Sequence, residues 1–203
     1  MQTVRQIDRL WNARQYDRLA RELLAARPEF SLRLVGELSQ SVPVAALGLI
    51  RLDELTQGAH PLNEKLIRTI LAAQESDGGW GDPVVSALCL RALMCSRGQG
   101  VAVHRGLAYI ANLQKSGGAW PALPIRRAAE DAYVSAFILF HLADQELFRA
   151  TVRLDDAVNW LAQNEPTLDP ESRRLWYRAS LRCRLTRSDV RPATARPLTL
   201  VAN

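Results

Sequence analysis

The stretch LAAQESDGGWGDP, residues 71–83, ends an apolar helical pattern, turns through two glycines and restarts at a proline. Residues 110–124 repeat the design as IANLQKSGGAWPALP. In both copies a glutamine and a tryptophan stand six residues apart with Gly-Gly between them, namely Gln74 and Trp80, then Gln114 and Trp120. A single glycine turn occurs in many folds, whereas recurrence of the whole pattern indicates duplication.

Each copy is followed by an apolar helical pattern, VVSALCLRALM at residues 84–94 and YVSAFILFHLA at residues 133–143. The two share a Val-Ser-Ala core, and their apolar residues recur at helical spacing. The duplicated unit is therefore a helix, a glycine turn and a second helix.

Helical patterns and prolines at helix starts extend over most of the chain, and no stretch is better explained as a strand, so we predict an all-α fold. The predicted helices are 4–26, 30–38, 43–55, 61–74, 83–94, 101–114, 129–143, 154–164 and 170–184, the last with Asp169 as its N-cap. We predict an N-terminal helical extension at 1–41, a repeat domain at 42–185 and a flexible C-terminal tail at 186–203.

The predicted helices differ in how their apolar residues are distributed. Residues 84–94 and 133–143 are apolar around most of the helix circumference, as expected for helices buried on several sides. Residues 61–74 are amphipathic, as expected for a helix with one exposed face. Two layers of helices in this order predict a solenoid or a closed α/α ring.

Composition limits the possible functions. The chain has 203 residues and a formal charge of +5, but its only lysines are Lys65 and Lys115, a bias typical of genome composition, so we expect no nucleic-acid partner. No apolar run reaches the roughly 18 residues of a membrane span, so we expect a cytoplasmic protein. Cys89, Cys95 and Cys183 lack metal-ligand spacing, and we interpret them as buried structural thiols.

The repeat resembles the QW repeats of the terpene cyclase (squalene-hopene cyclase-like) and protein prenyltransferase superfamily, whose helices form α/α toroids. The family pattern is a basic residue and Gly, an apolar or aromatic stretch, Gln, three residues, Gly, one residue and Trp. Residues 105–120 match it closely, and residues 66–80 match its second half. A third copy, residues 155–176, keeps Gln163 but lacks the glycine and the tryptophan. The resemblance spans residues 42–185 and implies an α/α toroid-like fold, a partial α/α barrel of helical hairpins.

In that family the glutamine at the end of an outer helix bonds to the start of the next inner helix, and the tryptophan stacks against it. The resemblance therefore assigns structural clamp roles to Gln74, Trp80, Gln114 and Trp120. The glycines then allow the tight turn, and the indole fills the joint between repeats.

Proton-initiated cyclases of this family carry Asp-x-Asp-Asp before an inner helix, where one carboxylic acid protonates the substrate in a dry pocket. The nearest match is AAEDAYVSAF, residues 128–137, in which Ala128 replaces the first acid. The resemblance implies Asp131 as the general acid with help from Glu130. The alternative is that both residues cap the helix, as Asp82 would one repeat earlier.

Tyr133, Phe137 and His141 recur at i, i+4 and i+8 and form the candidate substrate-binding face, although aromatic residues at this spacing also build cores. Zinc protein prenyltransferases use an Asp, a Cys and a later His, but Tyr133 and Arg178 stand at the Cys and His positions. A guanidinium does not ligate zinc, so we expect no metal and no cofactor.

Two functions remain open, because the chain has fewer helices than a complete ring and a cyclase needs a cavity closed to water. The first is a cyclase-like protein that binds an isoprenoid or another apolar ligand on its concave face, with a homodimer or a protein partner completing the ring. The second is a non-catalytic scaffold that docks a protein partner. Arginines of the last helix would line one edge and bind a diphosphate or an acidic partner: Arg173, Arg174, Arg178, Arg182 and Arg184.

Overall fold

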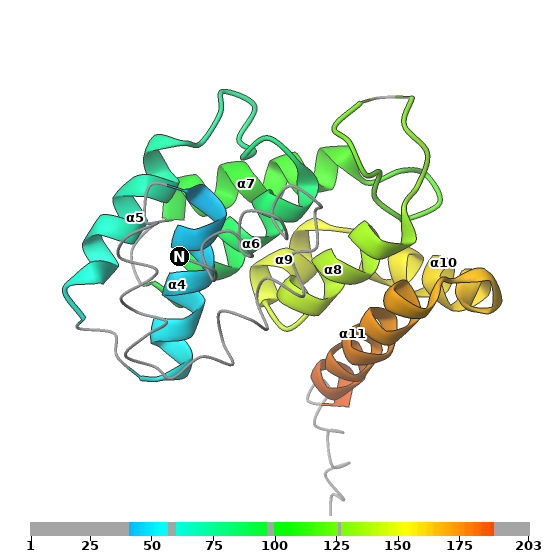
Figure 1. The fold of residues 1–203 in the computed structure, drawn as a ribbon. Helices are drawn as coiled ribbons and strands as arrows, with labels where there is room; N and C mark the ends of the chain where they lie inside the picture. The colour runs from blue at the N-terminus through cyan, green and yellow to red at the C-terminus, as the bar shows by residue number, and fades with distance from the viewer. Residues whose placement is uncertain (1–40, 57–59, 97–99, 126, 189–203) are drawn as a thin grey trace, which may run out of the picture.

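The computed structural model describes residues 41–56, 60–96, 100–125 and 127–188 (Figure 1). The predicted helices at residues 4–26 and 30–38 lie outside this part of the chain, as does the predicted extension apart from Ser41. Residues 189–203 of the predicted tail also lie outside it.

The described residues form eight α-helices and one 3-10 helix and contain no β-strand, so the predicted all-α class is confirmed. In chain order they are α4 (Val42–Glu54), α5 (Leu62–Ala72), α6 (Pro83–Cys95), α7 (Gly100–Leu113), α8 (Ala132–Leu142), α9 (Glu146–Thr151), α10 (Leu154–Asn164), the 3-10 helix η1 (Glu165–Thr167) and α11 (Pro170–Ser188). Within the described ranges, no helix is both long and apolar enough to span a membrane.

The helices are arranged in two layers. The inner layer consists of α4, α6, α8 and α11, each packed against the next, and in Figure 1 it runs from α4 on the left to α11 at the lower right. The outer helix α5 packs on α4, α7 packs on α6, and α10 contacts α8, while the short α9 lies against α7. Each of the outer helices α5, α7 and α10 therefore covers the inner helix that comes before it in the chain.

The number of buried residues on each helix agrees with its place in the inner or the outer layer. On α6 every residue is buried except Arg91, Met94 and Cys95, which lie near its C-terminal end. On α5, by contrast, only Leu66 and Ile70 are buried. A helix that is apolar all round must be covered on several sides, whereas an amphipathic helix needs one partner. The predicted contrast between buried and half-exposed helices is confirmed.

The largest buried side chains lie where the layers meet. Trp120, Phe137 and Phe148 are at most 1% exposed. The rings of Trp120 and Phe148 are 6.2 Å apart and tilted by 30°, so the tryptophan of the second glycine turn packs against the helix that follows α8. The turn is therefore anchored in the core rather than exposed.

Two elements differ from the prediction. The last helix continues to Ser188, beyond the predicted end at Arg184, so residues 186–188 of the predicted tail are helical. The six-residue helix α9 was not predicted, because Phe148 is its only buried residue and so short a segment gives no periodic pattern.

Candidate functional site

The two glycine turns form the same joint. The indole N–H of Trp80 donates to the carbonyl of Ile70 at 2.7 Å, and that of Trp120 donates to Ile110 at 2.8 Å. The backbone N–H of each tryptophan donates at 2.9 Å to a buried serine hydroxyl of the following inner helix, Ser86 or Ser135. Each tryptophan thus connects the outer helix before it to the inner helix after it.

The serines are functional residues of the joint that the sequence analysis did not single out. The signal was present, because Ser86 and Ser135 are the serines of the shared Val-Ser-Ala core. A buried backbone N–H without a partner is costly, and the serine hydroxyl satisfies it. Ser135 also donates to the carbonyl of Asp131 at 2.7 Å, which fixes the hydroxyl in place.

The glutamines bond to a different helix from the one that the resemblance implies. Gln74 Nε2 donates to the carbonyls of Gly78 and Ala102, both at 2.9 Å. Ala102 lies in the first turn of α7, which is the next outer helix and not the next inner helix. Each glutamine therefore ties neighbouring outer helices together, while the tryptophan makes the bond to the inner layer.

The second glutamine repeats this arrangement. Gln114 Nε2 donates to the carbonyls of Gly118 at 2.7 Å and Arg153 at 3.0 Å, and the backbone N–H of Arg153 donates back to Gln114 Oε1 at 2.9 Å. Arg153 is the N-cap of the next outer helix, α10. Its guanidinium also bonds to the carbonyl of Lys115.

Arginines complete both joints. Arg105 donates to the carbonyl of Glu75 at 2.7 Å, and Arg153 makes the matching bond to Lys115 one repeat later. Arg105 is the basic residue of the quoted repeat, but Arg153 was not identified from the sequence because it lies two residues before the third copy, residues 155–176. The joint thus extends into that third copy although its own glycine and tryptophan are missing.

The candidate acid Asp131 is the N-cap of α8. Its Oδ1 accepts the backbone N–H of Val134 at 2.9 Å, and its own N–H donates to the carbonyl of Trp120 at 2.8 Å. The side chain is half-buried, and neighbouring Glu130 is exposed. The two acids are therefore adjacent, and both are at least partly exposed.

Two other aspartates occupy the same place on other inner helices. Asp82 caps α6 by accepting the N–H groups of Val84 and Val85, both at 2.9 Å. The predicted cap Asp169 is confirmed, because it accepts the N–H groups of Glu171 and Ser172 at the start of α11. Hydrogen bonding, first from the Ser172 hydroxyl, lowers the pKa of the Asp169 carboxyl.

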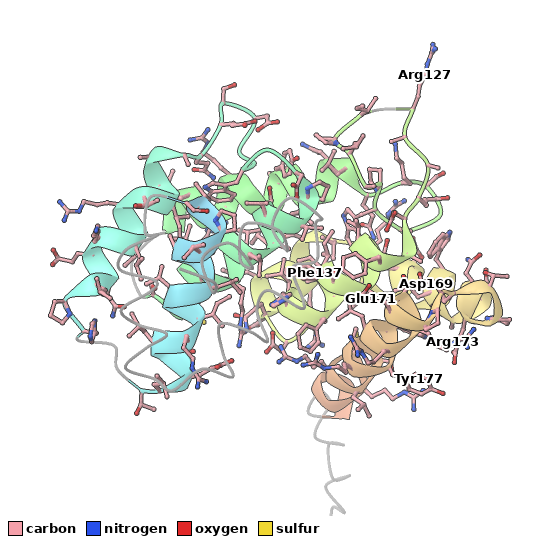
Figure 2. All side chains as sticks on the ribbon, in the orientation of Figure 1. Arg127, Phe137, Asp169, Glu171, Arg173 and Tyr177 are labelled. Atoms are coloured by element: carbon pink, nitrogen blue, oxygen red, sulfur yellow. The ribbon has the colours of Figure 1, made fainter. Side chains whose placement is uncertain are left out.

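The candidate substrate-binding residues form a row on α8. The rings of Tyr133 and Phe137 are 6.0 Å apart, and those of Phe137 and His141 are 4.4 Å apart. Phe137, labelled in Figure 2, is only 1% exposed and belongs to the core. Tyr133 and His141 are half-buried. The structure thus brings these three residues together, with the middle one fully enclosed.

His141 lies among cations. Burial lowers the pKa of its imidazole to about 3, and Arg182, Arg91 and Arg178 add to the shift. The histidine is therefore neutral at physiological pH. Phe140 packs on it edge to face at 4.9 Å, so apolar rings border it on two sides.

The same arginines join the inner helices at this end. Arg91 of α6 bonds both carboxylate oxygens of Asp144 at 3.2 Å, and Arg182 of α11 lies 3.7 Å from the same carboxylate. The guanidinium carbons of Arg178 and Arg182 lie 4.3 and 4.4 Å from the centre of the Phe140 ring. Arg182 also donates to the Phe140 carbonyl at 2.8 Å. These two arginines hold α11 against α8.

The cysteines fit the structural interpretation. Cys89 and Cys183 are buried and Cys95 is half-buried, and all three are free thiols. Burial raises the pKa of Cys89 and raises those of Cys95 and Cys183 to about 11. Thiols of this kind are protonated at neutral pH and are poor nucleophiles.

Two hollows in the surface are large enough to hold a small ligand. A pocket of 470 Å³ lies between α4, α5 and the end of α6 and includes Asp53, Asn63 and Cys95. A shallower hollow lies on α9 and α10 and includes Arg149 and Asp155. Neither is lined by Asp131 or by the aromatic row. Among the residues that the structure describes, no three His, Cys, Asp or Glu side chains cluster closely enough to hold a metal ion.

Comparison with protein-family models, with curated proteins and with solved structures finds no significant match to this chain.

Proposed function

We propose that this chain is a QW-repeat, α/α toroid-like domain that acts as a non-catalytic scaffold and docks a protein partner along its last inner helix. The alternating layers and the repeated joints at Trp80 and Trp120 support the toroid-like architecture. The exposed apolar side chains of the last inner helix, α11, support the functional part of the proposal.

Among the described helices, α8 is the inner helix that packs against α11. Each earlier inner helix packs against the next one, from α4 to α6, α8 and α11. On the side of α11 that faces away from α8, Tyr177 and Leu181 are each 59% exposed. Figure 2 shows Tyr177 on this side of the helix. Exposed apolar side chains next to each other on a helix are typical of an interaction surface.

The geometry at Asp131 favours a scaffold over an acid-initiated enzyme. A carboxylic acid that protonates an alkene needs a dry site that disfavours its charged form. Asp131 is instead half-buried and caps a helix, as Asp82 and Asp169 do. A role that three aspartates share at equivalent places is a structural role.

Native mass spectrometry of the protein purified from its own host tests this function. We expect a complex with a second protein, and we expect Tyr177→Glu combined with Leu181→Glu to release it. Val101 on α7 is 78% exposed, so Val101→Glu is a matched control that should retain the partner. A wild-type protein that runs as a bare monomer, or a complex that survives the double substitution, would contradict the proposal.

A ligand-binding, cyclase-like function is the second candidate, and the aromatic row of Tyr133, Phe137 and His141 favours it. An isoprenoid or other apolar ligand would then appear in the same mass spectra as a small bound mass. Tyr133→Ala should reduce that mass without unfolding the chain, because Tyr133 is only half-buried. Asp131→Asn would abolish cyclisation if Asp131 were the acid.

A further inference from the structure

We propose that the partner binds through an acidic amphipathic helix, which docks on the exposed face of α11. This inference rests on the scaffold function proposed above and adds the chemistry of the partner. The exposed face consists of Arg173, Arg174, Tyr177, Leu181 and Arg184, and it is called the arginine-bordered face below.

The first observation is where the charge lies. The sequence of α11 contains six arginines and one glutamate, so its formal charge equals the +5 of the entire chain. The other residues together are therefore neutral. Positive charge is denser on α11 than on the rest of the predicted repeat domain, because residues 42–169 have a formal charge of −3.

The second observation is how α11 divides into faces. Helical residues are spaced by about 100° around the axis. The buried residues of α11 all lie on the side towards α8, namely Ser172, Leu175, Trp176, Ala179 and Cys183. The opposite side has Tyr177 and Leu181 at its centre, with Arg173 and Arg184 along one edge and Arg174 along the other. In Figure 2, Arg173 and Tyr177 lie on the same side of the helix.

The arginines of α11 fall into two groups. Arg178 and Arg182 lie over the Phe140 ring and belong to the contact with α8. Arg173, Arg174 and Arg184 are exposed, as Arg178 also is, and they border the apolar pair. The arginine-bordered face is therefore an apolar strip with cations on both edges.

An acidic helix complements this face in shape and in charge. Inner helices of this protein already pack side by side, so a helix is the element that continues the layer past α11. Its apolar side chains would cover Tyr177 and Leu181, as amphipathic helices do in apolar grooves. Glutamate or aspartate on its two flanks would meet the arginines, which bind carboxylates well.

A second copy of this chain does not fit the same face. Two copies paired through α11 would bring Arg174 and Arg184 against the arginines of the other copy. Like charges in an interface oppose binding. The complementary surface must therefore come from a protein with acidic character.

A display library tests the inference with the full-length chain. The library encodes amphipathic helical peptides with a fixed apolar face and with Glu, Lys, Gln or Ser at random on both flanks. We expect selection on the wild-type protein to enrich peptides with several Glu on the flanks. For the enriched peptides, Arg174→Glu with Arg184→Glu should weaken binding at least about tenfold, because each lost charge pair becomes a repulsive one.

Control variants test whether peptide binding depends on the charge of α11 in particular. Lys65→Glu with Arg68→Glu makes the same charge change on the exposed face of α5 and should leave peptide binding unchanged. Selection on the charge-reversed α11 variant should enrich Lys in place of Glu. Both double variants keep their buried faces, and circular dichroism at increasing temperature verifies that they fold.

Three outcomes would overturn the inference. If neutral or basic peptides are enriched and their binding needs Tyr177 and Leu181, the acidic partner is wrong and the scaffold function stands. If no peptide binds in a manner that depends on α11, both proposals fail. If polyuridylate RNA or phosphatidylserine vesicles bind the arginines of α11 more tightly than any selected peptide does, the face recognises phosphate and not an acidic helix.

Discussion

Gly118 shows how tightly a single residue is constrained in the repeated joint. Its φ is +99°, and a Cβ added there would lie 2.4 Å from the carbonyl carbon of Asp156 and 2.7 Å from the backbone nitrogen of Ala157. Both neighbours belong to the backbone of α10, so neither can move away by rotating a side chain. The close approach of the turn to the next outer helix therefore requires glycine.

Gly118→Ala should lower the free energy of unfolding by roughly 1–3 kcal/mol, because the substitution adds backbone strain and a steric clash. Gly100, at the start of α7, has no other atom within 4 Å of an added Cβ, so Gly100→Ala is the matched control and should be neutral or slightly stabilising. Urea unfolding of both variants measures the difference. Equal losses would show that the contact with α10 does not limit this position.

His141 predicts a pH dependence of stability. Its pKa is about 3 in the folded protein, mainly because it is buried, and 6.5 is the ordinary value for an exposed imidazole. Between these values the unfolded chain binds a proton that the folded chain does not, so the free energy of unfolding decreases as the pH falls from 6.5 towards 3. Above that range both states are neutral, and this group adds no further pH dependence.

The test is urea unfolding of wild type and His141→Gln at several pH values. The loss of stability with acid should be shallower in the variant, since glutamine does not titrate. His104→Gln, at an exposed position of α7, is the matched control for removal of a histidine. Parallel curves for wild type and His141→Gln would rule out the predicted role of this imidazole.

At the scale of single elements, the inner helices α6, α8 and α11 begin alike. Each has an aspartate as N-cap, and a serine three or four residues later contributes a hydrogen bond within or next to the cap: Asp82 with Ser86, Asp131 with Ser135, and Asp169 with Ser172. In α11 the serine hydroxyl donates to the carboxylate of the capping aspartate, whereas in α8 it donates to the backbone carbonyl of that aspartate.

The cap interpretation of Asp131 makes a clear prediction. Asparagine caps helices about as well as aspartate, so Asp131→Asn should change the free energy of unfolding by less than about 0.5 kcal/mol. Asp131→Ala should cost about 1 kcal/mol, and Asp82→Ala should cost a similar amount. Thermal unfolding compares the three variants. A loss in Asp131→Asn as large as that in Asp131→Ala would show that the negative charge itself is needed.

Element types could be predicted well from sequence because they depend on local patterns. The positions of Pro83 and Asp169 marked helix starts, and the apolar run at residues 133–143 marked a buried helix. The partner of Gln74 could not be predicted, because Ala102 is 28 residues away and only the tertiary fold brings the end of α5 to the start of α7. Local patterns show which groups need a partner but not which distant group supplies it.

The whole molecule is held together by contacts between neighbours. Gln74 connects α5 to α7, and Gln114 connects α7 to α10. Within the inner layer, Arg91 and Arg182 meet at Asp144 and connect α6 and α11 near the end of α8. Stability in such an arrangement is close to a sum over adjacent units.

Loss of one connection should therefore destabilise only the helices that it joins. Gln114→Ala removes two bonds to Arg153 at the start of α10, worth about 1 kcal/mol each, so hydrogen exchange in α10 should accelerate roughly 30-fold. Exchange in α5 should not change, because α5 uses Gln74. The exposed Gln163 offers the control Gln163→Ala, which should leave both helices as they are. Faster exchange throughout the chain would instead indicate a single cooperative unit.

The glutamine connections also affect how the length of such a chain can change during evolution. Each joint involves only an outer helix, its glycine turn, the inner helix after it and the start of the next outer helix. Duplication or deletion of one coding segment for a hairpin would therefore leave the remaining joints chemically complete. The number of helices would change by whole hairpins, while the positively charged α11 would remain the last of the described helices. A docking helix could thus keep its partner while the body behind it diversified.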